Sequence, residues 1–381
     1  MAVLLACAGA RASESDEKQA DILFRSGLAA MQHGQLDVAV GTLRKLAQAA
    51  PTPRVRLELA RALYLNGEYH ESLTLFRQVY DAEGTPQTVK RNILPFMEAA
   101  ELRILRVRYG VRAITDSNPS KVAEGGTIFF NGVPLEYQPP ASKKVAYGIE
   151  PWLTVEKLWQ NGLLTKFFGS ARLFKNDDLD VGRFQFAAAR QVSSIPGLFV
   201  QAALDGEVSD VPYLMPSVET WKRFRLSDRA GVGLGAQLGY IGSENQGASG
   251  LYYRPYVFGD WTMFPNATLF GTLSLEGIDS RNDYYSFTTS KATAGVLLSV
   301  ADFNVAPQLT YSRTLFGEFD SFWGVTRRDT LIRPEIKVSS ERFEWKGIRP
   351  EINVFYEKRD SNVDIYDYNQ VGGSVNLTRL F

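Results

Sequence analysis

The chain has 381 residues, and its 42 basic and 42 acidic side chains cancel, so no net charge favours nucleic acid as a partner. One cysteine, Cys7, and two histidines, His33 and His70, are too few for a zinc site, a disulfide framework or histidine catalysis. The chain contains no run of about 18 apolar residues, so no transmembrane helix is predicted. We therefore expect no enzyme activity, no metal and no cofactor.

Residues 1–12 resemble the end of a secretory signal peptide. A short apolar run precedes Ala10-Arg11-Ala12, which matches an A-x-A cleavage pattern, although the usual basic segment before the run is missing. The tetrapeptide Leu4-Leu5-Ala6-Cys7 also resembles a lipobox, in which Cys7 would carry a lipid. We favour the signal peptide, because the β-barrel that we predict below for residues 104–381 needs no lipid anchor.

Two segments, 21–50 and 54–83, repeat each other at a spacing of 33 residues. Gly34 matches Gly67 in the turn between paired helices, and small and large apolar residues recur at equivalent positions. This pattern is typical of tetratricopeptide (TPR) repeats. Because two repeats are fewer than the three usually needed for stability, we expect residues 88–103 to form a capping helix, kinked at its proline.

Stacked helical pairs form a concave surface, which the first helix of each pair lines. In the second repeat this helix offers Arg54, Arg61 and Tyr64, and we predict these as client-binding residues. The alternative is that the arginines form only a solvated face. A helical-repeat module is usually an interaction module, and nothing in this one indicates catalysis.

From residue 104 onward, successive stretches alternate apolar and polar residues. In the clearest stretch, 230–242, Val232, Leu234 and Leu238 share one face, whereas glycines and Gln237 occupy the other. This alternation is typical of outer-membrane β-barrel strands, which turn an apolar face to lipid. A soluble β-sandwich is the alternative. A sandwich built from all the residues after 104, however, would have more apolar surface than its core can bury.

The first strand alternates apolar residues with Arg106, Arg108 and Arg112. An arginine that faces lipid near the membrane midplane costs roughly 2–4 kcal/mol, so we expect this face to line the lumen. Acidic partners lie on the polar faces of two other strands: Glu150, Glu156, Glu351 and Glu357. Such a balanced lumen indicates internal ion pairs rather than an ion-selective pore.

Twelve further strands bring the predicted count to fourteen, an even number, as single-chain bacterial barrels require. Besides the strands of Arg112 and Glu150, we predict strands near 163–175, 181–193, 198–209, 217–227, 230–242, 250–263, 266–278, 284–300, 302–315, 326–340, 347–359 and 366–381.

Loop lengths predict the orientation of the barrel. Connections after even-numbered strands are mostly tight, whereas those after odd-numbered strands are long and polar. The long connections are 116–142, 209–216, 243–249, 279–283, 316–325 and 360–365. Outer-membrane barrels have short periplasmic turns and longer outer loops, so the helices and the C-terminus are expected in the periplasm.

The last strand ends at Phe381. A terminal aromatic residue after alternating apolar residues resembles the signal that the bacterial barrel-assembly machinery reads, although Arg379 departs from that pattern. We therefore predict three parts: a signal-peptide remnant at 1–12, a periplasmic TPR-like helical domain at 20–103, and a 14-stranded antiparallel outer-membrane β-barrel at 104–381.

This order of parts resembles the surface lipoprotein assembly modulator family, and the likeness covers most of the chain. The residues that carry it are Arg91-Asn92-Ile93 with Phe96, and Asp116-Ser117-Asn118 at the end of the first strand. The resemblance implies an outer-membrane translocator that delivers lipoproteins, or soluble haem- and metal-scavenging proteins, to the cell surface. The helical domain is shorter here than is usual in that family.

Our leading hypothesis is therefore a protein translocator with a lipoprotein or secreted client. Expected partners are the client, outer-membrane lipid, the barrel-assembly machinery and periplasmic chaperones, and we expect a monomer. A polysaccharide exporter, which also joins TPR repeats to a barrel, is the first alternative; it would favour a wider lumen with acidic and aromatic residues. A passive porin is the second, but it leaves the helical module unexplained.

Overall fold

The computed structural model describes residues 18–123, 125–130, 133–139, 145–175, 179–343, 345 and 348–379. The predicted signal remnant at 1–12 and the terminal Phe381 lie outside these residues. The chain divides into two compact units. One unit contains the helices and ends at Arg106, with Lys157–Gln160 assigned to it; the other contains the β-strands. Among the described helices, none is long and apolar enough to cross a membrane.

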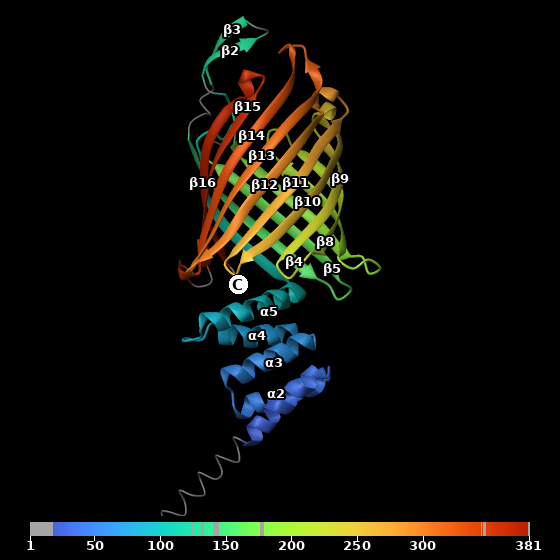
Figure 1. The fold of residues 1–381 in the computed structure, drawn as a ribbon, viewed down its shortest axis with the longest axis vertical. Coiled ribbons are helices and arrows are strands. Elements are labelled where there is room, and N and C mark those ends of the chain that lie inside the picture. Colours follow the sequence, from blue (N-terminus) through green and yellow to red (C-terminus); the bar gives the residue numbers. More distant parts are fainter. Residues whose placement is uncertain are drawn as a thin grey trace, which may run out of the picture. The chain divides into compact units, whose positions relative to one another are not determined.

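The helical unit consists of a helix at residues 18–32 and four helices that follow it. These are α2 (Leu36–Ala49), α3 (Pro53–Leu65), α4 (Tyr69–Tyr80) and α5 (Gln87–Ile104) (Figure 1). The predicted helical module and its capping helix are thus confirmed, and Pro95 lies inside α5. The helices α2 to α5 pack in chain order, each against the next.

The two turns inside the helical pairs have the same geometry. Gly34 and Gly67 have φ angles of 73° and 86°, a left-handed conformation that favours glycine. In the first turn, the amide of Gln35 donates to the carbonyl of Ala30; in the second, the amide of Glu68 donates to the carbonyl of Leu63. Both turns are therefore Schellman motifs, which explains why glycine recurs after 33 residues.

The core of the helical unit consists of aliphatic side chains at the helix–helix contacts. Leu43, Leu59 and Leu63 are almost completely buried there. Gly27 lets the first helix approach closely, since a Cβ at this position would lie 2.7 Å from the Cγ atom of Leu43. Small residues thus set the helix spacing, as the repeat pattern predicts.

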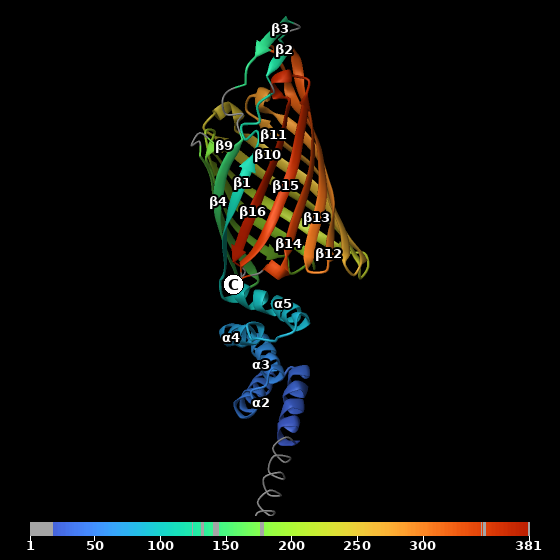
Figure 2. The same ribbon diagram turned by 90° about the vertical axis from the view of Figure 1, so that its left-hand side faces the viewer.

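The second unit is a closed antiparallel barrel of fourteen strands, which confirms the predicted fold and strand count (Figure 1). The strands are β1 (Arg106–Asp116), β4 (Ala146–Leu158), β5 (Leu163–Phe174), β6 (Val181–Gln191), β7 (Leu198–Val208), β8 (Tyr213–Arg225), β9 (Ala230–Ser243), β10 (Gly250–Phe264), β11 (Ala267–Ser280), β12 (Phe287–Val300), β13 (Phe303–Asp320), β14 (Val325–Ser340), β15 (Ile348–Ser361) and β16 (Tyr368–Arg379). Figure 2 shows β1 between β4 and β16, where the first and last strands close the barrel.

Side-chain exposure alternates along the strands and separates an outer from an inner face. In β9, Leu234 and Leu238 are more than half exposed. Neighbouring glycines lie beneath aromatic rings of β10: a Cβ at Gly233 would lie 2.2 Å from Phe258, and one at Gly235 would lie 2.3 Å from Tyr256. The glycine row predicted on the polar face therefore makes room for rings inside the barrel.

Three predicted boundaries are wrong. The strand expected at 284–300 begins at Phe287, because Asp283–Tyr285 forms a short 3-10 helix before it. The other two differences are at a proline and at a bulge. The strand expected at 217–227 begins at Tyr213, so the loop expected at 209–216 is shorter. Pro216 belongs to this strand. In the pairing of β8 with β9, Met215 and Pro216 have no partner residue, so the missing N–H of proline is tolerated there.

The loop expected at 316–325 is also shorter, because β13 continues to Asp320. The register between β13 and β14 shifts between Leu315 and Phe319, as in a β-bulge, and this interrupts the alternation that would have extended the predicted strand.

The long connection expected at 116–142 contains a hairpin that sequence reasoning did not predict. Its strands are β2 (Gly126–Phe130) and β3 (Val133–Tyr137) (Figure 2). The amide of Phe129 donates to Asp364 in the connection between β15 and β16, at 2.9 Å. The hairpin is thus tied to a second connection at the same end of the barrel.

Candidate functional site in the barrel lumen

The inner faces of β1, β4 and β5 meet at a buried carboxylate. Glu150 is 5% exposed, and its Oε2 atom lies 3.2 Å from the Nη1 atom of Arg112 and 3.6 Å from the Nη2 atom of Arg172. The structure therefore brings together two of the predicted lumen residues, Arg112 and Glu150, and adds Arg172 from β5.

A second buried carboxylate, Glu357 of β15, has four partners. Its Oε1 atom accepts hydrogen bonds from the hydroxyl of Tyr368 at 2.6 Å and the amide of Gln370 at 3.1 Å. Its Oε2 atom accepts from the guanidinium of Arg333 at 3.0 Å, and the Nζ atom of Lys121 lies 3.3 Å from Oε1. Both oxygens of this carboxylate are therefore satisfied inside the barrel wall.

Lys121 reaches Glu357 because the segment after β1 is anchored to the last strand. The amide of Ser117 donates to the carbonyl of Val371, and the amide of Val371 donates to the hydroxyl of Ser117. Lys121 itself has a left-handed φ of 51°. The segment is thus held next to the pair of strands, β1 and β16, that closes the barrel.

Asn118 holds this segment in shape. It is 1% exposed, its amide nitrogen donates to the carbonyls of Val122 and Asn369, and its backbone amide donates to Asp116. The Asp116-Ser117-Asn118 sequence therefore forms a turn that links the end of β1 to β16. This contact gives a physical role to a motif that carried the family resemblance.

A cavity of about 360 Å³ lies between these two carboxylate clusters, within the inner face of the barrel. Arg333 and Lys337 of β14 lie on either side of Glu335, each 3.4 Å from it, and Arg333 also stacks 3.9 Å from the ring centroid of Phe355. The charged side chains of the lining are Arg112, Asp116, Lys121, Glu150, Arg172, Arg333, Glu335, Lys337 and Glu351. Five are basic and four are acidic, a balance unlike the acidic and aromatic lining expected of a sugar exporter.

Of the remaining predicted lumen residues, Glu351 lines this cavity, whereas Arg106, Arg108 and Glu156 do not. These three are partly buried on their strands and lie away from the cluster.

The opposite wall carries a third carboxylate cluster. Glu219 of β8 accepts hydrogen bonds from Arg254 at 3.1 Å and from the hydroxyl of Tyr256 at 2.9 Å, both on β10. A cavity of about 530 Å³ lies beside them. Among the described residues, no group of three His, Cys, Asp or Glu side chains could hold a metal ion. The lumen chemistry on both walls is ion pairing and hydrogen bonding.

The three predicted client-binding residues lie in different surroundings. Arg54 and Arg61 are exposed on α3, and the guanidinium of Arg54 lies 5.0 Å from the ring centroid of Phe24. Tyr64 is half-buried and packs edge-on against Tyr69 and Phe96, with centroid distances of 5.7 and 6.0 Å. Tyr64 thus contributes to packing between helices, whereas the two arginines are open to solvent.

Sequence reasoning missed several residues of the lumen clusters. Arg172, Arg333 and Gln370 could have been found, because they lie on the inner-facing positions of their strands. Lys121 had no such signal, since it lies in a connection whose path depends on the contacts of Asn118.

One protein family matches the C-terminal part of this chain. Residues 244–381 match the family described as "SlipAM: Surface lipoprotein assembly modifier". This match confirms the predicted family resemblance over the C-terminal part of the barrel. A comparison with the curated proteins found no match.

Several solved outer-membrane proteins are similar in structure. The outer membrane channel DcaP of Acinetobacter baumannii is 10% identical, with a TM-score of 0.43, covering 72% of this chain and 97% of that one. An anion-selective porin from Comamonas acidovorans is 9% identical, with a TM-score of 0.41, covering 73% and 100%. A bacterial polysaccharide outer membrane secretin is 12% identical, with a TM-score of 0.41, covering 72% and 98%.

Proposed function

We propose that this chain is an outer-membrane protein that delivers lipoproteins, or related secreted proteins, to the cell surface. The observation that carries the proposal is the combination of a closed fourteen-stranded barrel with a family match over residues 244–381. The role of the family, as its description states it, is the assembly of surface lipoproteins.

In this proposal the helical domain, residues 20–103, binds the client in the periplasm. Arg54 and Arg61 support the assignment, because both are exposed on one helix and free to contact an acidic segment of a client. The orientation rests on loop lengths, and periplasmic chaperones are further proposed partners. The barrel-assembly machinery is a further proposed partner.

The barrel, residues 104–381, provides the passage. Its lumen holds carboxylates and basic groups in pairs, so a polypeptide with mixed charges could exchange contacts along the wall without meeting a region of one sign. Because the proposal needs only binding and passage, no catalytic group and no cofactor enter it.

The test measures the surface exposure of a lipoprotein client that is co-expressed with this chain. The fraction of client that added protease degrades on intact cells is compared among cells with the full chain, with a chain lacking residues 20–103, and with no chain. We expect exposure with the full chain and a large decrease in the other two.

The control is barrel assembly, followed by heat-modifiable migration of each chain on gels. If the client is exposed equally in all three strains while the full chain is assembled, the proposal is wrong. If the shortened chain assembles and exposes as much client as the full chain, the barrel role stands and the role of the helices is wrong.

A further inference from the structure

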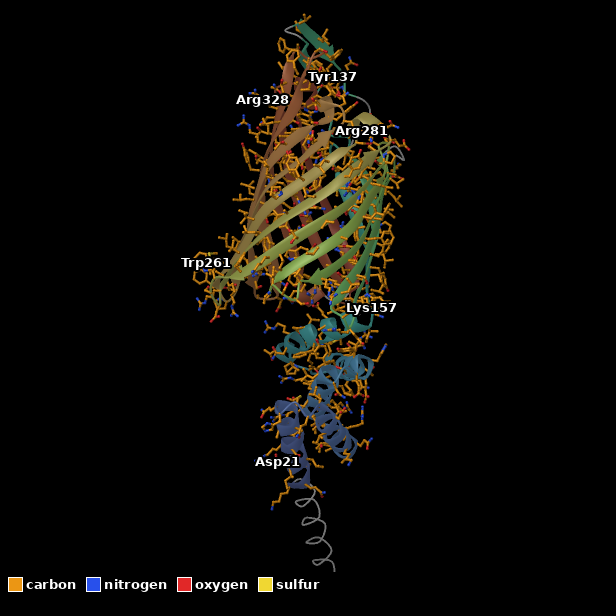
Figure 3. All side chains as sticks on the ribbon, turned by 90° about the vertical axis from the view of Figure 1, so that its right-hand side faces the viewer. Asp21, Tyr137, Lys157, Trp261, Arg281 and Arg328 are labelled. Atoms are coloured by element: carbon orange, nitrogen blue, oxygen red, sulfur yellow. The ribbon has the colours of Figure 1, made fainter. Side chains whose placement is uncertain are left out.

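Three basic side chains face outward on neighbouring strands near one end of the barrel. Arg313 of β13, Arg328 of β14 and Lys358 of β15 are all exposed. Figure 3 places Arg328 at the same end of the barrel as Tyr137 and Arg281, and away from Trp261 at the other end. Outward-facing arginines are unusual on a wall that meets lipid, because a buried charge there is costly.

The strand register brings these residues into one patch. Arg313 lies opposite Thr330, and Arg328 lies opposite Leu315, so the two arginines are diagonal neighbours, roughly 7–8 Å apart. Thr330 lies in turn opposite Asp360, whose carboxylate pairs with Lys358 at 2.8 Å. We call Arg313, Arg328, Lys358 and Asp360 the outer basic patch; it carries three positive charges and one negative charge.

The two guanidinium groups of the patch have no hydrogen-bond or ion-pair partner in the part of the chain that the structure describes. Lys358 is compensated by Asp360, so Arg313 and Arg328 are the cations that remain available. Each presents a planar fork of donors that matches a phosphate group.

The patch lies at the edge of the apolar band. Outward-facing Leu309 and Tyr311 precede Arg313 on β13, and both are about half exposed. From Phe303 to Arg313 the strand advances ten residues, which is roughly 25 Å of barrel height at 3.3 Å per residue and a tilt near 40°. This height equals that of the apolar band of outer-membrane barrels, so the arginines reach the level of the lipid headgroups.

We propose that the outer basic patch binds the phosphate of a lipid headgroup in the membrane around the barrel. The apolar side chains below it contact the acyl chains, and the guanidinium groups of Arg313 and Arg328 hold the phosphate. In the orientation proposed above, this lipid lies in the cell-surface leaflet. The inference concerns the barrel wall and does not depend on lipoprotein delivery.

The test measures lipid binding by the full chain, purified in a neutral detergent, with native mass spectrometry. The probes are diphosphorylated lipid A and the same lipid without its phosphates. The variant Arg313→Gln/Arg328→Gln is compared with Arg190→Gln/Arg281→Gln, which removes the same charge outside β13 to β15. We expect roughly a tenfold loss of phosphorylated-lipid binding in the first variant and little change in the second.

All four substitutions are at exposed side chains, and heat-modifiable migration checks that each variant is assembled. Three results would overturn the inference: equal binding of phosphorylated lipid by wild type and Arg313→Gln/Arg328→Gln, equal loss in both variants, or equal binding of the two lipids by wild type. Competition by inorganic phosphate alone, without retention of lipid, would assign the patch to free phosphate and also reject the lipid.

Discussion

At the scale of single residues, the buried carboxylate of Glu357 joins three parts of the barrel wall. It is 3% exposed, and its partners come from β14, from β16 and from the segment after β1. A buried carboxylate is stable only when opposite charges and donors compensate for its lost hydration. Glu357 is therefore the residue whose loss should disturb the lumen most.

We predict that Glu357→Gln lowers the free energy of unfolding by about 2 kcal/mol, because Lys121 and Arg333 lose a buried counter-charge while the side-chain volume is kept. Urea unfolding of the barrel in lipid vesicles measures this change. The control is Glu207→Gln, which breaks a more exposed pair with Arg183 and should cost less than about 1 kcal/mol. Equal losses in the two variants would contradict the role of Glu357.

Gly372 lies beneath the ring of Phe355. A Cβ there would lie 2.3 Å from the ring, so Gly372→Ala should displace Phe355 and cost about 1–3 kcal/mol. In Gly182→Ala the new methyl group meets its nearest atom at an ordinary 3.6 Å, and stability should not fall. The two variants are compared by the temperature at which the folded barrel loses its fast gel migration. A lower temperature for both variants than for the wild type would refute the steric argument.

At the scale of elements, the helices allow a prediction of opposite signs. Gly67→Ala forces a Cβ into a left-handed turn and should destabilise the helical unit by about 1 kcal/mol. Gly41→Ala, inside α2 and with open space around it, should stabilise the unit by up to about 1 kcal/mol. Thermal unfolding of the full chain, followed by helical circular dichroism, gives both shifts. A stabilising effect of Gly67→Ala would show that the turn is not left-handed.

Connections between strands give a pH-dependent prediction. The pKa of Tyr284 is raised from 10.0 to about 12. Burial is the larger cause, and the hydrogen bond that the Tyr284 hydroxyl donates to Asp320 is the second. The folded state thus favours the neutral phenol, and this stabilisation is complete below pH 10 and is lost as the pH rises through about 12.

The difference between the ultraviolet titrations of the native barrel and of Tyr284→Phe isolates the phenolate step of Tyr284 from those of the other tyrosines. In Asp320→Asn this step should move to lower pH. If the titration of Asp320→Asn is unchanged, the carboxylate does not control Tyr284.

The helices and strands could be predicted from the sequence wherever the periodicity of their own side chains determined them. Alternation identified fourteen strands, and the 33-residue repeat identified the paired helices, because side-chain periodicity reports which face is buried. The hairpin of β2 and β3 was not found, since its five-residue strands carry no core-facing pattern and depend on contacts such as that of Phe129 with Asp364. The lumen clusters were found only in part for the same reason: alternation gives the face of Glu357 but not the path that brings Lys121 to it.

At the scale of the whole molecule, two observations agree: a barrel with an ion-paired lumen and a family match to surface lipoprotein assembly modifiers. In the proposed function, a client polypeptide crosses the membrane through this lumen. Two adjacent residues of β15 lie on opposite faces of the barrel wall. Asn353 lines the inner cavity, whereas Val354 is 45% exposed on the outer face.

The most direct measurement is photo-crosslinking during delivery of a lipoprotein client, with a photoreactive amino acid in place of Asn353 or of Val354. Both variants must first show the heat-modifiable migration of an assembled barrel. Passage through the lumen predicts a client adduct from position 353 and none from position 354. Adducts from neither position while the client still reaches the surface, or equal adducts from both, would contradict passage through the lumen.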